Sequence, residues 1–97
     1  NHIMKYLIID DEPDAIDVLK HHLNNIPFME LLTSFRDPLD ALEYLQSNTI
    51  DLLFLDINMP KLSGINFPKF LENPPLIIFT TAYSEYAIES YELKAVD

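Results

Sequence analysis

The sequence lacks cysteine and has a single glycine, and these two scarcities exclude several kinds of chemistry. With no cysteine among 97 residues, disulfides, thiolate catalysis and cysteine-based zinc sites are impossible. Gly64 is the only glycine, whereas a dinucleotide-binding fingerprint, a Walker phosphate loop and a G-x-S-x-G nucleophile turn each need two or more. The function must therefore depend on other groups.

Basic residues and long apolar runs are also scarce. Six lysines and arginines stand against sixteen acidic residues, which gives a net charge of −10. Because such a chain repels phosphate groups, we expect it to bind neither nucleic acid nor an anionic membrane. No run is long enough to span a bilayer, and no signal peptide is visible at the start. We therefore expect a soluble, cytoplasmic protein.

The sequence does contain an alternation of apolar strands and amphipathic helices. Strands are predicted at 5–9, 29–35, 51–56 and 76–80, where short apolar runs occur. Helices are predicted at 13–25, from Asp37-Pro38 onward, from Ser63 towards Leu71, and from Ser84 to about residue 93. Alternation of this kind predicts βαβ units and a parallel sheet covered by helices on both faces. A ligand site is then expected at the carboxyl ends of the strands.

The length of the chain suits one small domain with one core. Residues 1–3 precede Met4 and are expected to be a remnant of cloning. We therefore expect the domain to span residues 4–97.

Carboxylates gather where two of the predicted strands end. Asp10 and Asp11 follow the first strand, and Asp56 ends the third. These strands are neighbours in a doubly wound sheet, so the three carboxylates should meet, and their mutual repulsion should raise a pKa or bind a cation. Oxygen ligands without histidine or cysteine favour Mg²⁺. Glu12 and Asp14 are expected to serve only the start of the next helix, where negative charge is favourable.

Three motifs, taken with their spacing, carry a family resemblance. "IIDDEP" at 8–13, "LDINMPKLSG" at 55–64 and "IIFTTAY" at 77–83 together resemble the receiver domain of bacterial two-component response regulators. The resemblance covers residues 4–97 and implies a flavodoxin-like, doubly wound parallel sheet in the order 2-1-3-4. The stretch "TTAYSEYAIESYELKAVD" at 80–97 further resembles receivers of the LytR/AlgR type, which usually carry a C-terminal LytTR DNA-binding domain.

The resemblance implies a role for each site residue. Asp56 would be the phosphoacceptor that attacks a phosphohistidine of a sensor histidine kinase, and it would also contact Mg²⁺. Asp11 would bind Mg²⁺ directly, and Asp10 would bind it directly or through water. Asn58 would supply its backbone carbonyl to the metal. These roles suit phosphoryl transfer, which needs positioning and charge neutralisation more than covalent machinery.

The resemblance also implies a switch. Thr81, rather than its neighbour Thr80, would be the hydroxyl that bonds the phosphoryl oxygen, and Pro60 and Gly64 would shape the loop after Asp56. The implied protein is a phosphoaccepting switch for a downstream LytTR output domain, and not an enzyme with an external substrate.

A complete receiver has a fifth strand and a last helix, which would lie beyond Asp97 together with the active-site lysine of the family. Neither Lys61 nor Lys94 matches that lysine. We therefore expect a truncated receiver whose fourth strand, 76–80, is an open sheet edge. Because open edges invite pairing with another chain, self-association is expected through the fourth strand and the helix after it.

Two other functions stay open. A phosphatase of the haloacid dehalogenase type also uses an aspartate at a strand end. That family needs Asp-x-Asp, however, whereas Asp10 is followed by Asp11 and Glu12, and the chain is too short for a cap domain. The stronger rival is a phosphorylation-incompetent, receiver-like interaction or dimerisation module.

Overall fold

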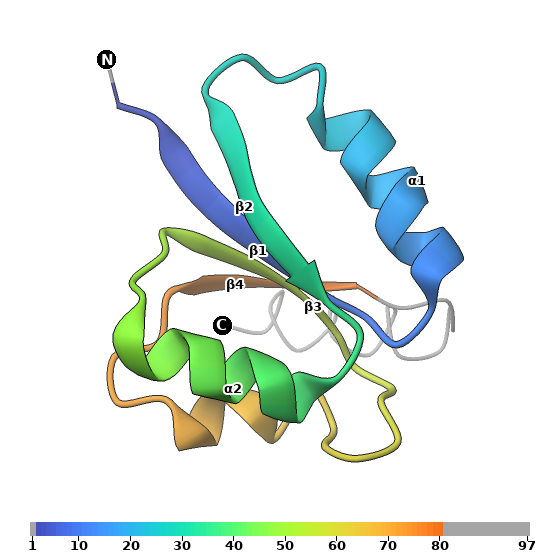
Figure 1. Cartoon of the computed structure of the whole chain (residues 1–97), viewed down its shortest axis with the longest axis vertical. Helices are drawn as coiled ribbons and strands as arrows, with labels where there is room; N and C mark the ends of the chain where they lie inside the picture. The colour runs from blue at the N-terminus through green and yellow to red at the C-terminus, as the bar shows by residue number, and fades with distance from the viewer. Residues whose placement is uncertain (1, 81–97) are drawn as a thin grey trace, which may run out of the picture.

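A four-stranded parallel sheet forms the centre of the computed structural model, which describes residues 2–80 (Figure 1). The sheet order is β2-β1-β3-β4, and every neighbouring pair is parallel. The strands are β1 (Met4–Ile9), β2 (Met29–Phe35), β3 (Leu52–Asp56) and β4 (Leu76–Thr80). The predicted flavodoxin-like order 2-1-3-4 is therefore confirmed. The helix predicted from Ser84 lies outside the described residues.

Two helices follow β1 and β2, and both begin where the sequence signals predict. Pro13 is the first residue of α1 (Pro13–Leu23), a position that needs no backbone N–H. Helix α2 (Pro38–Ser47) is capped by Asp37, whose side chain accepts a hydrogen bond from the amide of Leu39. Helix α1 ends two residues earlier than predicted, because two asparagines follow it and asparagine favours caps over helix interiors. Within residues 2–80, no helix is long and apolar enough to cross a membrane.

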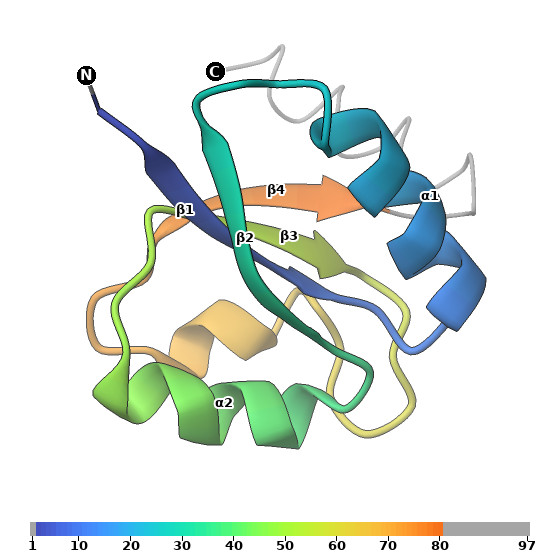
Figure 2. The same ribbon diagram turned by 45° about the horizontal axis from the view of Figure 1, so that its top comes forward.

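The core consists of two layers, one on each face of the sheet. Successive strand residues point to opposite faces, and α1 and α2 cover opposite faces (Figure 2). The layer beneath α1 contains Tyr6, Ile8, Ile16, Leu23, Leu52 and Phe54. The layer beneath α2 contains Leu7, Ile9, Ala41, Leu53, Leu55, Met59 and Phe67. Strands β1 and β3 are therefore buried on both faces, and their carboxyl ends are held firmly.

The helix predicted from Ser63 towards Leu71 is much shorter in the structure. Only a 3-10 helix, η1 (Phe67–Phe70), is present. The amide of Phe67 does donate to the carbonyl of Ser63 at 2.9 Å, which begins a helical turn. Pro68 comes next and has no N–H with which to continue an α-helix. The segment therefore tightens into η1, and the buried ring of Phe67 still joins the core beneath α2.

Strand β4 is not covered on both faces by the described residues, whereas its apolar run predicted coverage on both. Leu76, Ile78 and Phe79 are 64%, 42% and 37% exposed, and only Ile77 packs against the core. Strand β4 pairs with β3 on one side, and no other described strand lies along its second side. Its exposure therefore follows from its place at the edge of the described sheet and not from its composition.

Candidate metal centre

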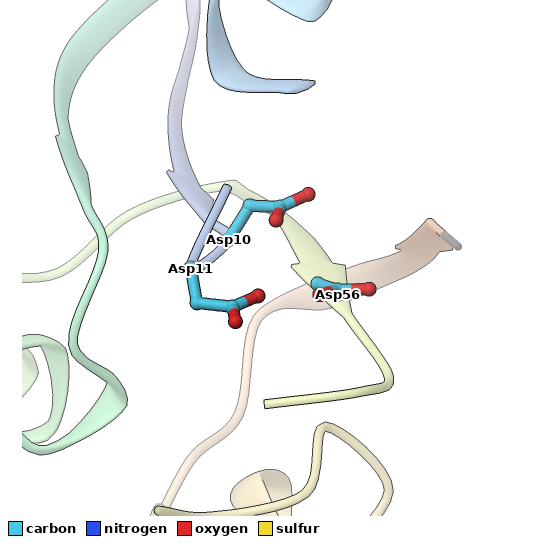
Figure 3. Close-up of side chains that lie close together, drawn as sticks. All are labelled: Asp10, Asp11 and Asp56. Atoms are coloured by element: carbon cyan, nitrogen blue, oxygen red, sulfur yellow. The ribbon is translucent and has the colours of Figure 1, made fainter. Parts of the chain in front are cut away.

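Three carboxylates converge at the carboxyl ends of β1 and β3. Asp56 is the last residue of β3, and Asp10 and Asp11 follow β1 directly. The two strands are neighbours in the sheet, so their ends lie side by side. One carboxylate oxygen from each residue lies within 4.8 Å of the others (Figure 3). The expected meeting of these three side chains is therefore confirmed.

Two of the three carboxylates are buried and are oriented by backbone amides. Asp10 is 8% exposed and Asp56 is 7% exposed. The side chain of Asp10 accepts a hydrogen bond from the amide of Glu12 at 3.0 Å. That of Asp56 accepts one from the amide of Asn58 at 3.4 Å. Each acidic group is therefore oriented by the loop that follows it.

Burial and mutual repulsion make the ionised forms of these groups unfavourable. Burial, followed by the nearby charge of Asp10, raises the pKa of Asp56 to about 7. The pKa of Asp10 is also raised, chiefly by burial, although its bond from the amide of Glu12 opposes the shift. A cation between the carboxylates would favour their ionised forms. The arrangement therefore suits a bound positive charge.

The chemistry of the donors points to a hard divalent cation. Among the described residues, the cluster holds only carboxylates and has no histidine or cysteine. Mg²⁺ prefers oxygen ligands and usually takes one or two carboxylates together with water molecules. Asn58 lines the same cavity of about 600 Å³ as Asp10, Asp11 and Asp56. Four of the five predicted site residues therefore surround one space, and the fifth, Thr81, lies outside the described residues.

The cavity extends from the carboxylates along α1. Its further lining includes Ala15, Val18, Leu19 and His22 of that helix, and Thr80 at the end of β4. Glu12 and Asp14 also line the cavity but do not belong to the carboxylate cluster.

Gly64 lies where a side chain would collide with the end of β3. A Cβ atom at this position would lie 2.0 Å from the carbonyl oxygen of Asp56, which is far inside van der Waals contact. The amide of Gly64 donates to the carbonyl of Ile57 at 2.8 Å and so closes the loop that carries Asn58. The close approach explains why glycine stands here, as the family motif implies.

Arg36, Asp37 and Lys61 make contacts near the site that the sequence did not predict. The Nε atom of Arg36 donates to the carbonyl of Asp11 at 3.4 Å. The Nζ atom of Lys61 pairs with Oδ2 of Asp37 at 2.7 Å. The sequence identified Asp37 only as a helix cap. The pairs join residues 25 and 24 positions apart, and no periodic pattern marks contacts of that kind.

A family model and several relatives of known sequence all match this chain over nearly its whole length. Residues 6–97 match the family described as response regulator receiver domain. Protein MrkE of Klebsiella pneumoniae is 43% identical over 98 residues, which covers 97% of this chain and 36% of MrkE. Transcriptional regulatory protein YpdB of Escherichia coli K12 is 41% identical, with 97% of this chain and 40% of YpdB covered. Sensory transduction protein LytR of Staphylococcus haemolyticus is 42% identical, with 97% and 38% covered. The chain thus spans well under half the length of these relatives.

Solved structures agree in fold. The response regulatory domain of protein mrkE from Klebsiella pneumoniae superposes with a TM-score of 0.77 at 40% identity, covering 94% of this chain and 77% of that one. The response regulator RcsB in its complex with DNA superposes with a TM-score of 0.80 at 26% identity, covering 97% and 50%. Both comparisons extend over almost the whole chain.

Proposed function

Because the chain belongs to the response regulator receiver domain family, we propose that Asp56 accepts a phosphoryl group from a sensor histidine kinase in a Mg²⁺-dependent reaction. One observation carries the proposal: Asp56 is buried at the end of β3 with its carboxylate beside those of Asp10 and Asp11. Three neighbouring carboxylates are unfavourable in their ionised forms, and a bound cation would stabilise those forms. This arrangement therefore supports a phosphoacceptor site that binds a metal ion.

The transfer uses the carboxylate of Asp56 as the nucleophile. One of its oxygens forms a bond to phosphorus, the bond between phosphorus and the imidazole nitrogen breaks, and the electron pair of that bond stays on the nitrogen. Strand β3 is buried along its whole length, which holds Asp56 for in-line attack. The carboxylate must be ionised to attack, so its pKa of about 7 has to fall when the site is loaded.

The proposed Mg²⁺ ligands are the carboxylates of Asp10, Asp11 and Asp56 and the backbone carbonyl of Asn58. When bound, the ion would supply the positive charge that offsets both the acidic cluster and the phosphoryl oxygens. Thr81 is proposed as the hydroxyl that bonds the phosphoryl group after transfer. Both assignments follow the family motifs, and the gathering of Asp10, Asp11, Asp56 and Asn58 around one cavity supports the metal assignment.

Incubation with Mg²⁺ and acetyl phosphate, followed by intact-mass measurement, tests the proposal. We expect a mass increase of one phosphoryl group, which is lost in Asp56→Asn and kept in Asp40→Asn, the same change at an exposed position on α2. Steady hydrolysis of acetyl phosphate without a stable adduct would instead support a phosphatase. An unchanged mass would support an interaction module that is not phosphorylated.

The remainder of the proposal concerns the whole protein. We propose that residues 4–97 belong to a cytoplasmic regulator that carries a LytTR DNA-binding output domain. Relatives described as a transcriptional regulatory protein and a sensory transduction protein support this, as does the share of their length that the chain spans. Sequencing the gene beyond the codon for Asp97 tests it. A basic, β-rich segment there is expected, and a stop codon would contradict the proposal.

A second candidate function is self-association, and the exposed apolar side chains of β4 favour it. Strand β4 is the edge strand of the described sheet, its side chains Leu76, Ile78 and Phe79 are exposed, and the unpaired backbone of such an edge pairs readily with a second copy. Light scattering of the 97-residue chain should give a mass above that of a monomer, and Ile78→Lys should lower it. Val18→Lys, at an exposed apolar position on α1, is the matched control. A monomer at high concentration would contradict this candidate.

A further inference from the structure

Residues 35–37, which are the last residue of β2 and the two-residue connection to α2, contact the loop that carries Asp10 and Asp11. The carbonyl of Phe35 accepts a hydrogen bond from the amide of Asp10 at 3.0 Å. The next residue, Arg36, donates from Nε to the carbonyl of Asp11 at 3.4 Å. Both contacts are made to the backbone of the acidic loop, so they fix its path without using the carboxylates of Asp10 and Asp11. We call residues 35–37 the β2–α2 bracket.

The last residue of the bracket contacts the other loop of the site. Asp37 uses one carboxylate oxygen to accept from the amide of Leu39 at 2.9 Å, and the other to pair with Lys61 at 2.7 Å. Because the bond to Leu39 already fixes the side chain of Asp37, this carboxylate is a preorganised partner for Lys61. Lys61 lies three residues after Asn58, on the loop that follows Asp56.

The sheet order gives these contacts their significance. Strand β1 lies between β2 and β3, so the bracket extends past the end of β1 to contact the loop after β3. Figures 1 and 2 both show the first turn of α2 beside that loop. The bracket is therefore connected to both loops that carry the proposed metal ligands, one from each strand.

We propose that the β2–α2 bracket sets the separation of these two loops, and that Asp37 and Lys61 are positioning residues for Mg²⁺ binding. The proposal rests on the proposed function, since it takes Mg²⁺ as the ion that the loops hold. Neither residue belongs to the carboxylate cluster, so neither is proposed as a ligand. The ion pair is solvent-accessible, and exposed pairs are weak, so we expect a change of about two- to fivefold in affinity when it is broken.

Two neutralising variants give the decisive comparison. Lys61→Met removes the cation, and Asp37→Asn removes the anion while it keeps an N-cap side chain. If the bracket positions the loops, both variants raise the Kd for Mg²⁺, as measured by calorimetric titration of the 97-residue chain. If only through-space charge matters, Lys61→Met lowers the Kd and Asp37→Asn raises it. Opposite signs would therefore overturn the proposal.

Three controls separate positioning from general effects. Lys69→Met makes the same charge change on η1, where the amino group contacts only Asn66 among the described side chains, and should leave the Kd near that of the wild type. Lys61→Arg keeps the cation and should restore most of the affinity. In about 1 M salt, where exposed charges are screened, Lys61→Met and the wild type should converge. Failure of Lys61→Arg to restore binding would contradict an ion-pair role.

A measurement without metal distinguishes failure of this proposal from failure of the proposed function. The amide of Gly64 donates a hydrogen bond to the carbonyl of Ile57. The rate of hydrogen exchange at this amide therefore reports how often the loop after Asp56 opens. We expect this exchange to be several-fold faster in Lys61→Met than in Lys69→Met. If the wild type binds no Mg²⁺, the proposed function is wrong, and the exchange rates still decide whether the pair holds the loop. Equal exchange rates at Gly64 in the two variants would contradict the proposal that the β2–α2 bracket positions this loop.

Discussion

Strands β3 and β4 lie side by side and read almost alike, as "LLFLD" and "LIIFT". Every residue of β3 is buried, with at most 7% exposure, whereas Leu76 and Ile78 of β4 are 64% and 42% exposed. Leu76 pairs in register with Leu52, and Ile78 with Phe54, so the two strands present the same kinds of side chain at equivalent positions.

The difference shows that burial in this sheet is set by neighbours and not by strand composition. Strand β3 has β1 on one side and β4 on the other, and both core layers include its side chains. Strand β4 contributes only Ile77 to these layers. The charged group that needs a rigid position, Asp56, ends the strand that is held on all sides.

The largest expected effect comes from making the same substitution in both strands. Leu53→Ala leaves a cavity at a position with 0% exposure, and should lower the free energy of unfolding by about 3 kcal/mol. Leu76→Ala changes an exposed position and should cost less than about 0.5 kcal/mol. Urea unfolding followed by circular dichroism measures both. Similar losses in the free energy of unfolding for the two variants would contradict the difference in burial between β3 and β4.

The next largest effect is expected from a substitution at Gly64, which tests whether the backbone at the end of β3 is as tightly packed as the rest of the strand. In Gly64→Ala the new methyl group must displace the backbone at Asp56 or move the loop. We expect a loss of about 2 kcal/mol in the free energy of unfolding, typical of overpacking. Ser63→Ala, next in the chain, is the control for the loop itself and should cost less. A Gly64→Ala protein as stable as the wild type would mean that the strand end moves easily.

The smallest effect concerns pH and contrasts Asp56 with Thr80, its register partner at the end of β4. The pKa of Asp56 is raised to about 7, above its value in an unfolded chain, so the folded protein binds the extra proton between about pH 4 and pH 7. This group's contribution to stability is therefore present below about pH 4 and is lost as pH rises through 7. Without metal, the free energy of unfolding of the wild type should fall by about 1.4 kcal/mol relative to Asp56→Asn between pH 6 and pH 8.

Thermal unfolding of both proteins across this pH range, with and without Mg²⁺, provides the measurement. A bound cation favours the ionised carboxylate and should remove most of the pH dependence. Parallel stability curves for wild type and Asp56→Asn would show that Asp56 is not the group that titrates. Thr80→Val should leave the pH dependence unchanged, because Thr80 carries no charge.

Much of the fold could be predicted because its signals are local. Apolar runs located the strands, Pro13 marked the start of α1, and Asp37-Pro38 marked the start of α2. The length of the segment after Gly64 could not be predicted in the same way, since Pro68 interrupts an otherwise suitable helical pattern. The exposure of β4 was also beyond local signals, because it depends on which segments lie next to the strand.

The carboxylates of the site could be placed for a similar reason. Asp10, Asp11 and Asp56 stand at strand ends, and a parallel sheet brings neighbouring strand ends together. The contact of Lys61 with Asp37 depends instead on the path of two loops in space, and no residue pattern records it. The sequence thus located the proposed ligands, and the structure was needed to find the residues that surround them.

A hydrogen bond at the carboxyl ends of β3 and β4 couples the backbone after Asp56 to the end of β4. The amide of Ile57, immediately after Asp56, donates to the carbonyl of Thr80 at 3.2 Å. Any rotation of the peptide unit between Asp56 and Ile57 must therefore pull on the final carbonyl of β4 or release it. A chemical change at Asp56 that rotated this peptide unit would therefore be transmitted through that hydrogen bond to the carbonyl of Thr80 in the exposed strand β4.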